Sequence, residues 1–189
     1  MLTYSELLTK RRSIRDFEPK KVAKNVIQEI IQEACLAPSA SNGQPWKFIV
    51  INNQTLMQKL STESKKNILA KIEQDPTARI ARYKATLTDA DFNVFYNAPC
   101  LVIICGKKES DYFQRDCSLA VAYLMFAATV RGLGTCWIGL GDQIQDTKLR
   151  QEIGLPDDYE IAAPIIIGYP KQIPAPTPRN APIILKTID

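Results

Sequence analysis

Apolar and polar positions along the chain change their spacing from segment to segment, and each spacing predicts a different element. Between residues 24 and 36 the apolar side chains recur every three or four positions, with glutamines and glutamates opposite, which predicts an amphipathic helix. The runs 100–105 and 161–168 are almost wholly apolar and predict strands covered on both faces. A shorter apolar segment, 47–51, follows a polar turn and predicts another strand. The pattern therefore indicates a sheet with helices packed against it.

Four further elements complete this outline. A capping-box pattern that begins at Thr3 predicts a short helix directly after it. Segment 117–131, with Asp116 as its expected cap, is apolar on every face, so we expect protein around it on all sides. A partner subunit is a natural source of that surround. A strand is expected from Thr135 onward, and a helix of about ten residues is expected to end at Gly154.

Two segments differ in character within what we interpret as a single domain over residues 1–189. In 62–91, eleven of the thirty residues are charged, yet the apolar positions keep helical spacing, so we expect surface helices that form a lid. In 170–182, five of the thirteen residues are proline, which excludes a central strand. We therefore expect 170–189 to be an extended C-terminal arm whose aliphatic end docks across a dimer.

Composition narrows the possible chemistry. With 46% hydrophobic and 23% charged residues, the chain is typical of a globular domain. It contains no histidine, which excludes Ser-His-Asp and Cys-His catalysis and any histidine-ligated metal site. The five cysteines form no Cys-x-x-Cys pair, so neither a zinc site nor a disulfide framework is expected. Because these catalytic groups are missing, we expect an enzyme of this composition to depend on a bound cofactor for its reactivity.

Charge and hydropathy limit the possible partners. No apolar run approaches the roughly 20 residues that cross a bilayer, and the first residues show no pattern of a secretory signal, so we expect a cytoplasmic protein without a membrane partner. Residues 1–25 hold seven Lys or Arg against three Asp or Glu, and residues 169–189 hold three against one. A solvated basic face is one interpretation, but we favour the convergence of both ends on a small anion. No nucleic-acid partner is expected, because such proteins normally carry a larger excess than the net charge of +4 found here.

Two motifs suit such an anion. The run 11–15, Arg-Arg-Ser-Ile-Arg, places three guanidinium groups and a hydroxyl within five residues, a donor set suited to bidentate capture of a phosphate. The run 38–46, Pro-Ser-Ala-Ser-Asn-Gly-Gln-Pro-Trp, is a polar turn with small and amide side chains that leads directly into the predicted strand 47–51. Together the two motifs could hold a molecule with an anionic tail and a flat, hydrogen-bonding ring.

These motifs, followed by Gly-Leu-Gly-Thr-Cys-Trp-Ile-Gly at 132–139, resemble the FMN-dependent nitroreductase family in their order, and the similarity extends from Tyr4 to about Leu185. The resemblance implies an α+β fold: a three-layer α/β/α sandwich with a mixed, mainly antiparallel sheet. It also implies an intertwined homodimer with FMN sites at the interface. No catalytic side chain is implied, because the flavin carries the chemistry.

The resemblance further implies which residues bind FMN. Arg11, Ser13 and Arg15 would hold the phosphate, the ribityl chain and the pyrimidine edge of the flavin. Arg12 would lie close by. Arg179 is either a further phosphate ligand on the arm or a surface arginine. The other subunit would line the flavin with residues of its polar turn, namely Pro38, Ser39, Ala40, Ser41, Asn42 and Gln44.

Backbone groups of a third segment would lie near the flavin N5, where glycine permits close approach. This segment comprises Cys136, Trp137, Ile138 and Gly139. Trp137 is equally consistent with a place in the core. Many family members carry Glu where this chain has Ile138, which leaves open whether a carboxylate role in positioning a nicotinamide carries over. Asn67 loosely matches a family asparagine at the polar edge of the flavin.

The resemblance thus implies an NAD(P)H-dependent flavin oxidoreductase. NADH or NADPH would pass hydride to the flavin and leave, and a small-molecule electron acceptor such as a nitroaromatic or a quinone would take its place, which is a ping-pong mechanism. One alternative is a specialised flavin enzyme of the same family, such as a reductive dehalogenase or a metabolite oxidase. Another is a non-catalytic flavin-binding protein.

Overall fold

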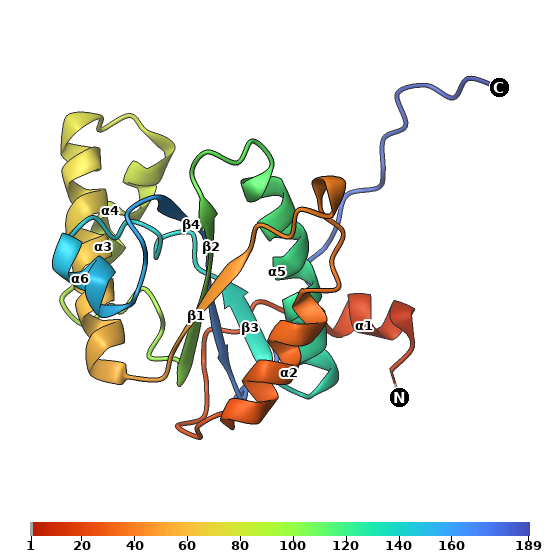
Figure 1. The fold of residues 1–189 in the computed structure, drawn as a ribbon, viewed down its shortest axis with the longest axis horizontal. Helices are drawn as coiled ribbons and strands as arrows, with labels where there is room; N and C mark the ends of the chain where they lie inside the picture. Colours follow the sequence, from red (N-terminus) through yellow and green to blue (C-terminus); the bar gives the residue numbers. More distant parts are fainter. Residues whose placement is uncertain (1) are drawn as a thin grey trace.

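A four-stranded sheet lies between two layers of helices in the computed structural model of the chain, which describes residues 2–189 (Figure 1). The strand order is β1-β2-β4-β3, and all three neighbouring pairs are antiparallel. The strands are β1 (Lys47–Ile51), β2 (Cys100–Lys107), β3 (Gly134–Trp137) and β4 (Tyr159–Gly168). This arrangement is the α+β sandwich that the resemblance implies. Its parallel component among the described residues is one isolated bridge, between Ser13 and Thr135.

Each face of the sheet has its own helical layer and its own core (Figure 1). One layer contains α3 (Gln54–Gln74), α4 (Lys84–Thr88) and α6 (Thr147–Glu152), and the other contains α2 (Lys24–Ala34) and α5 (Phe113–Val130), with α1 (Tyr4–Lys10) against α5. Successive side chains of a strand point to opposite faces. Accordingly, Leu101 and Ile103 of β2 pack toward α3, whereas Val102 and Ile104 pack toward α5. Burial on both faces explains why this strand is apolar from Cys100 to Cys105.

Two helix boundaries differ from the sequence predictions. Helix α5 begins at Phe113, three residues before Asp116, so Asp116 is not its cap. The Asp116 carboxylate instead accepts the backbone N–H of Ala40, at 3.2 Å from each oxygen. Helix α6 has six residues rather than ten, because Asp146 caps it through the N–H of Leu149 at 2.9 Å.

Helix α5 is also less enclosed than its composition predicts. Leu119, Tyr123 and Val130 keep between 41 and 52% of their surface exposed within the single chain. These positions form an apolar strip on the outer face of the layer, which remains open to a further covering element.

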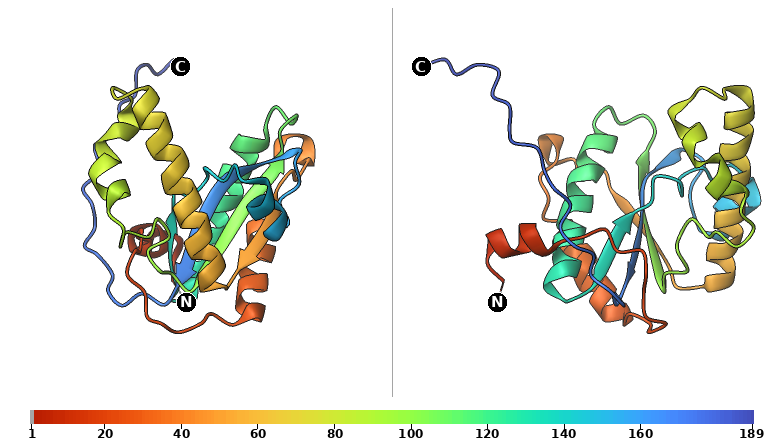
Figure 2. Two further views of the ribbon diagram at one scale, coloured as in Figure 1. Left: turned by 90° about the vertical axis from the view of Figure 1, so that its left-hand side faces the viewer. Right: turned by 180° about the vertical axis from the view of Figure 1, so that it is seen from behind.

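The two ends of the chain meet at the outer edge of the sheet. After α1, the N-terminal segment runs along β3, where the N–H of Ile14 donates to the carbonyl of Thr135 at 2.9 Å. A Cβ on Gly134 would lie 2.5 Å from the Ile14 side chain, so glycine is required for this close approach. The C-terminal arm leaves β4 beside the same segment (Figure 2, right), and the N–H of Lys171 donates to the Asp16 carbonyl at 3.2 Å. Residues far apart in sequence are thereby joined at one edge.

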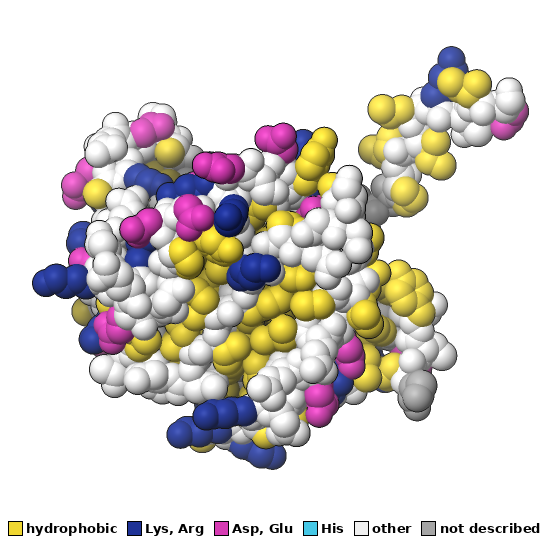
Figure 3. All heavy atoms as spheres, in the orientation of Figure 1, with side chains coloured by type: hydrophobic (Ala, Val, Ile, Leu, Met, Phe, Trp, Pro, Cys, Tyr) yellow, Lys and Arg dark blue, Asp and Glu magenta, His cyan; other side chains and the backbone are white. Residues whose placement is uncertain are grey.

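The arm beyond this junction forms no helix or strand. Its first half lies against the N-terminal segment, and its end extends away from the body of the chain (Figures 1 and 2). Its aliphatic side chains stand in the open (Figure 3), and Leu185 is 95% exposed. Within residues 2–189, none of the helices combines the length and the apolar character that spanning a membrane requires.

Candidate functional site

The junction of the two chain ends encloses a cavity of about 290 Å³. One wall comes from the segment after α1, and the other comes from the first half of the arm. The lining residues are Arg11, Arg12, Ser13, Arg15, Pro174, Ala175, Thr177 and Arg179. We call this cavity the anion pocket. The structure thus brings together all five sequence-predicted residues of the two basic ends.

Positive charge dominates the anion pocket. Its lining includes four guanidinium groups and no carboxylate, and none of the four forms an ion pair within residues 2–189. Arg12 donates to the Arg11 carbonyl at 2.6 Å, and Arg179 donates to the carbonyls of Thr177 and Pro178 at 3.3 Å. Four positive charges around one small cavity repel one another, and a bound anion relieves that repulsion. The donor set and the volume therefore fit a phosphate group.

A second, larger cavity of about 600 Å³ lies beside the first. Its lining residues are Arg15, Ile80, Tyr83, Val94, Tyr96, Trp137, Ile138, Gly139 and Leu140. We call it the ring pocket, because its walls are mainly apolar and aromatic and its volume lies within the roughly 300–1,000 Å³ of small-molecule sites. Arg15 lines both cavities, and its guanidinium lies 5.7 Å from the centre of the Tyr96 ring. One ligand can therefore place an anionic end and a flat ring on either side of Arg15.

The segment 137–139 forms one wall of the ring pocket as the continuation of β3. The N–H of Ile138 donates to the Pro164 carbonyl at 2.9 Å, which fixes the segment to β4. A Cβ on Gly139 would meet no atom within 4 Å, so the backbone here borders open space and a planar ligand can approach it closely. Trp137 is 40% exposed and lines the pocket. The alternative that Trp137 belongs to the core is therefore wrong.

Tyr96 forms part of the wall in a strained backbone conformation. Its φ is +52°, followed by +50° at Asn97, both in the left-handed region that non-glycine residues rarely adopt. The turn is held by the N–H of Tyr96, which donates to the Asn93 carbonyl at 2.9 Å, and by fully buried Phe95. Such strain costs on the order of 1–3 kcal/mol and clusters at functional sites.

The polar turn at 38–44 lies outside both cavities of this chain. It is nevertheless well defined: Ser41, Asn42 and Gln44 all have φ between 44 and 53°. The N–H of Gln44 donates to Ser39 Oγ at 3.0 Å. With the Asp116 contact described above, these bonds hold Pro38, Ser39, Ala40, Ser41, Asn42 and Gln44 as a rigid, exposed projection.

Two further predicted residues have other neighbours. Asn67 lines neither cavity, because its side-chain amide donates to Glu63 at 2.7 Å and to the Gln143 carbonyl at 2.8 Å. Cys136 is buried beneath the segment 137–139, and burial raises the pKa of its thiol, against the opposing effect of nearby Arg15.

Sequence reasoning did not assign Ile80, Val94 and Leu140 to the site. They come from three separate segments and are ordinary aliphatic residues, so no local pattern marks them. The prolines of the arm did indicate an extended chain, but no pattern singled out Thr177 as a residue of the site.

The fold and the paired cavities correspond to a class of flavin-binding α+β proteins, and the family follows from the sequence. The model of the Nitroreductase family matches residues 8–169, so the chain belongs to the Nitroreductase family.

Individual relatives extend over most of the chain. An Archaeoglobus fulgidus protein with the provisional name NADH dehydrogenase/NAD(P)H nitroreductase is 27% identical over 172 residues, which cover 88% of this chain and 84% of that protein. The iodotyrosine deiodinase of Thermotoga neapolitana is 25% identical over 186 residues, which cover 95% of this chain and 95% of that protein. A Bacteroides fragilis nitroreductase crystallised with bound FMN superposes with a TM-score of 0.81, at 20% identity, over 100% of this chain and 99% of that one.

Proposed function

We propose that this chain is an FMN-dependent oxidoreductase that takes hydride from NADH or NADPH and passes electrons to a small acceptor such as a nitroaromatic or a quinone. The observation that carries the proposal is the pair of adjoining cavities, one lined by four guanidinium groups and the other walled by aromatic side chains and exposed backbone. Relatives named as NAD(P)H nitroreductases support the nicotinamide donor. The exchange of donor and acceptor in one place is a ping-pong mechanism.

The side chains around the anion pocket fit the FMN phosphate. Arg11, Arg12, Ser13 and Arg179 would hold it, and Arg15 would reach the pyrimidine edge from its place between the cavities. The segment 137–139 would support the ring through its backbone. When bound, the flavin supplies a ring that accepts hydride and releases electrons to the acceptor. The positive surround favours negative charge on that ring.

A second copy of the chain would complete the site. The rigid turn at 38–44 contacts neither cavity of its own chain, so it is free to line the cavities of a partner. The exposed strip on α5 offers an interface. Beside it, a groove of about 460 Å³ between α1, α2 and α5 is lined by Tyr4, Leu36, Phe126 and Val130 among others and suits the aliphatic end of a partner's arm. We therefore propose a homodimer in which the helices of 62–91 act as a lid.

Colour tests the proposal directly. The purified protein should be yellow or become yellow with added FMN, release FMN on denaturation, and lose its colour when NADH or NADPH is added anaerobically. A protein that stays colourless and takes up no FMN would rule out the proposed function. A yellow protein that neither nicotinamide bleaches would support a non-catalytic flavin-binding protein instead.

A second candidate is reductive dehalogenation of an aromatic substrate. It is favoured by the similarity to the Thermotoga neapolitana protein named iodotyrosine deiodinase and by the two tyrosines, Tyr83 and Tyr96, that line the ring pocket. Release of iodide from 3-iodotyrosine by the chemically reduced, FMN-loaded protein would support it. Turnover of nitroaromatics or quinones without iodide release would favour the first candidate.

A further inference from the structure

The wall of the ring pocket continues into a loop that has little regular structure of its own. Residues 138–146 connect β3 to α6 without a helix or strand. Within the loop, the N–H of Gly141 donates to the Ile138 carbonyl and that of Ile144 to Asp142, both at 3.0 Å. Ile138 and Ile144 are buried with residues of α3 in one core cluster. The loop therefore depends on α3 for much of its shape.

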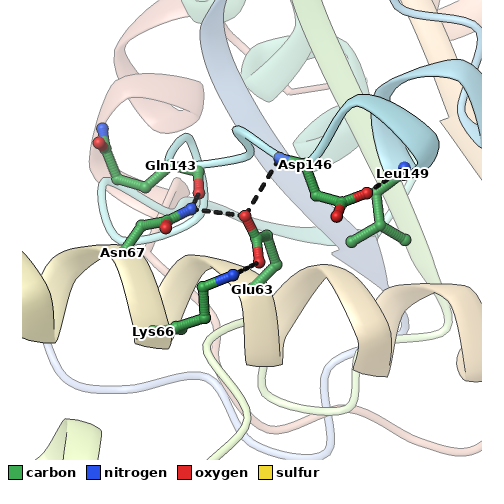
Figure 4. Close-up of polar contacts among 6 residues, drawn as sticks. All are labelled: Glu63, Lys66, Asn67, Gln143, Asp146 and Leu149. Carbon is green, nitrogen blue, oxygen red and sulfur yellow. Dashed lines mark hydrogen bonds and ion pairs between the residues drawn. The ribbon is translucent and has the colours of Figure 1, made fainter.

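Three polar side chains of α3 bind the backbone of this loop, and two of them, Glu63 and Asn67, are drawn in Figure 4. Ser64 Oγ donates to the Leu140 carbonyl at 2.6 Å and accepts the Gln143 N–H at 3.3 Å. Asn67 donates to the Gln143 carbonyl at 2.8 Å. Glu63 Oε1 accepts the N–H of Asp146 at 3.1 Å. We call Glu63, Ser64 and Asn67 the α3 clasp.

Glu63 lies at the centre of the clasp. The same Oε1 accepts from Asn67 at 2.7 Å, which orients the asparagine toward the loop, and Oε2 accepts from Lys66 at 2.8 Å (Figure 4). Glu63 is 7% exposed and Ser64 is fully buried. Their hydrogen bonds to the loop therefore replace hydrogen bonds to water. Burial raises the Glu63 pKa, but the bonds from Lys66, Asn67 and Asp146 together hold it below its ordinary value. A buried side chain that accepts all these hydrogen bonds fixes the positions of its partners.

We propose that Glu63 is a positioning residue for the flavin site: through the α3 clasp it fixes the loop 139–146 and with it the backbone of 137–139 that forms the wall of the ring pocket. This inference rests on the proposed binding of FMN. It also gives Asn67 a role other than the direct flavin contact that the family resemblance implies. Glu63 fixes the position of the loop, and the loop fixes the position of the pocket wall.

The test compares four proteins: wild type, Glu63→Ala, Glu63→Gln and Glu73→Ala. Glu73 is an exposed glutamate on the same helix and serves as the matched control. Glu63→Gln keeps a carbonyl oxygen that can accept the bonds made at Oε1, and it removes the charge. Two quantities are measured at a temperature at which all four remain folded by circular dichroism. They are hydrogen exchange of the segment 139–146 without FMN and the FMN dissociation constant.

We expect Glu63→Ala to accelerate exchange in 139–146 and to weaken FMN binding roughly tenfold, the factor for one lost hydrogen bond of ordinary strength. Glu63→Gln should restore most of both, and Glu73→Ala should match wild type. Faster exchange with unchanged FMN affinity would overturn the proposal and leave the clasp a purely structural device. Equal losses for Glu63→Ala and Glu63→Gln would also overturn it, because charge and not position would then matter.

Two further outcomes are separable. If Glu63→Ala does not fold, Ser64→Ala removes the contacts to Leu140 and Gln143 with almost no change in volume, and the same two measurements apply to it. If wild type itself binds no FMN, the proposed function fails. Hydrogen exchange then still reports whether Glu63 holds the loop, so this failure differs from a failure of the clasp.

Discussion

Replacement of Arg179 by alanine separates phosphate binding from fold stability. In the free protein Arg179 is exposed and contacts two carbonyls of its own arm at 3.3 Å, which is long for a guanidinium hydrogen bond. It forms no ion pair within residues 2–189. Its loss should therefore change the free energy of unfolding by no more than about 0.5 kcal/mol.

The expected effect on FMN binding is larger. A hydrogen bond between a guanidinium and a phosphate contributes about 1.5–3 kcal/mol, and because Arg179 is exposed, we take the lower end. That corresponds to a roughly tenfold weaker affinity for FMN. Riboflavin shares the ring and the ribityl chain and lacks the phosphate, so its affinity should not change.

The assay is a titration of the apoprotein with FMN and with riboflavin, followed by quenching of flavin fluorescence at fixed ionic strength. Lys148→Ala is the control, because it removes one exposed positive charge from α6, outside both cavities. Equal weakening of both ligands by Arg179→Ala would refute the placement of the phosphate, as would the same FMN loss in Lys148→Ala. An unchanged FMN affinity would show that Arg179 is a surface arginine without a role in phosphate binding.

Two predictions concern stability. Gly134→Ala should destabilise the fold by about 1–3 kcal/mol, since the new Cβ would lie 2.5 Å from Ile14. Gly139→Ala should have little effect, because its new Cβ would meet no atom within 4 Å. Urea unfolding measures the stability of both variants, and similar losses would contradict the close approach of Gly134 to Ile14. The hydrogen bond from Arg131, at 2.6 Å, is the main cause that holds the pKa of Glu33 below its ordinary 4.5. A depressed carboxylate pKa stabilises the fold above the unfolded value and loses that effect as the pH falls below it. Glu33→Gln should therefore lose less stability than wild type when the pH is lowered through 4.5 toward 3, measured by thermal melting, and parallel curves would contradict it.

Local signals made most elements of this fold predictable. The capping box that begins at Thr3 is present with both of its hydrogen bonds, because all of its partners lie within one turn. The buried strand 100–105 was marked by its continuous apolar run, since a strand covered on both faces has no polar positions. Such features need no knowledge of distant residues, and for that reason the sequence alone indicates them.

The wrong predictions arise where a side chain that suits a local role binds a distant residue instead. Asp116 precedes an apolar run and has the side chain of a good helix cap, but its carboxylate is taken by the N–H of Ala40, 76 positions away. The same contact that misled the prediction of α5 holds the turn at 38–44, a segment that sequence reasoning assigned to the site. A tertiary contact of this length leaves no periodic trace in the sequence.

The residues of the candidate site show the same difference between local signals and distant contacts. The basic residues of 11–15 and Arg179 were placed together from two signals, the excess of positive charge at both chain ends and the family resemblance, and the structure brings them together around the anion pocket. Asn67 was assigned by its type within a family pattern, yet its partner in the fold is a carbonyl of the loop 139–146. An amide that binds backbone and an amide that binds a ligand have the same sequence signature. They can be distinguished by the polar groups that surround them, and here the buried carboxylate of Glu63 accepts a hydrogen bond from Asn67 within the α3 clasp.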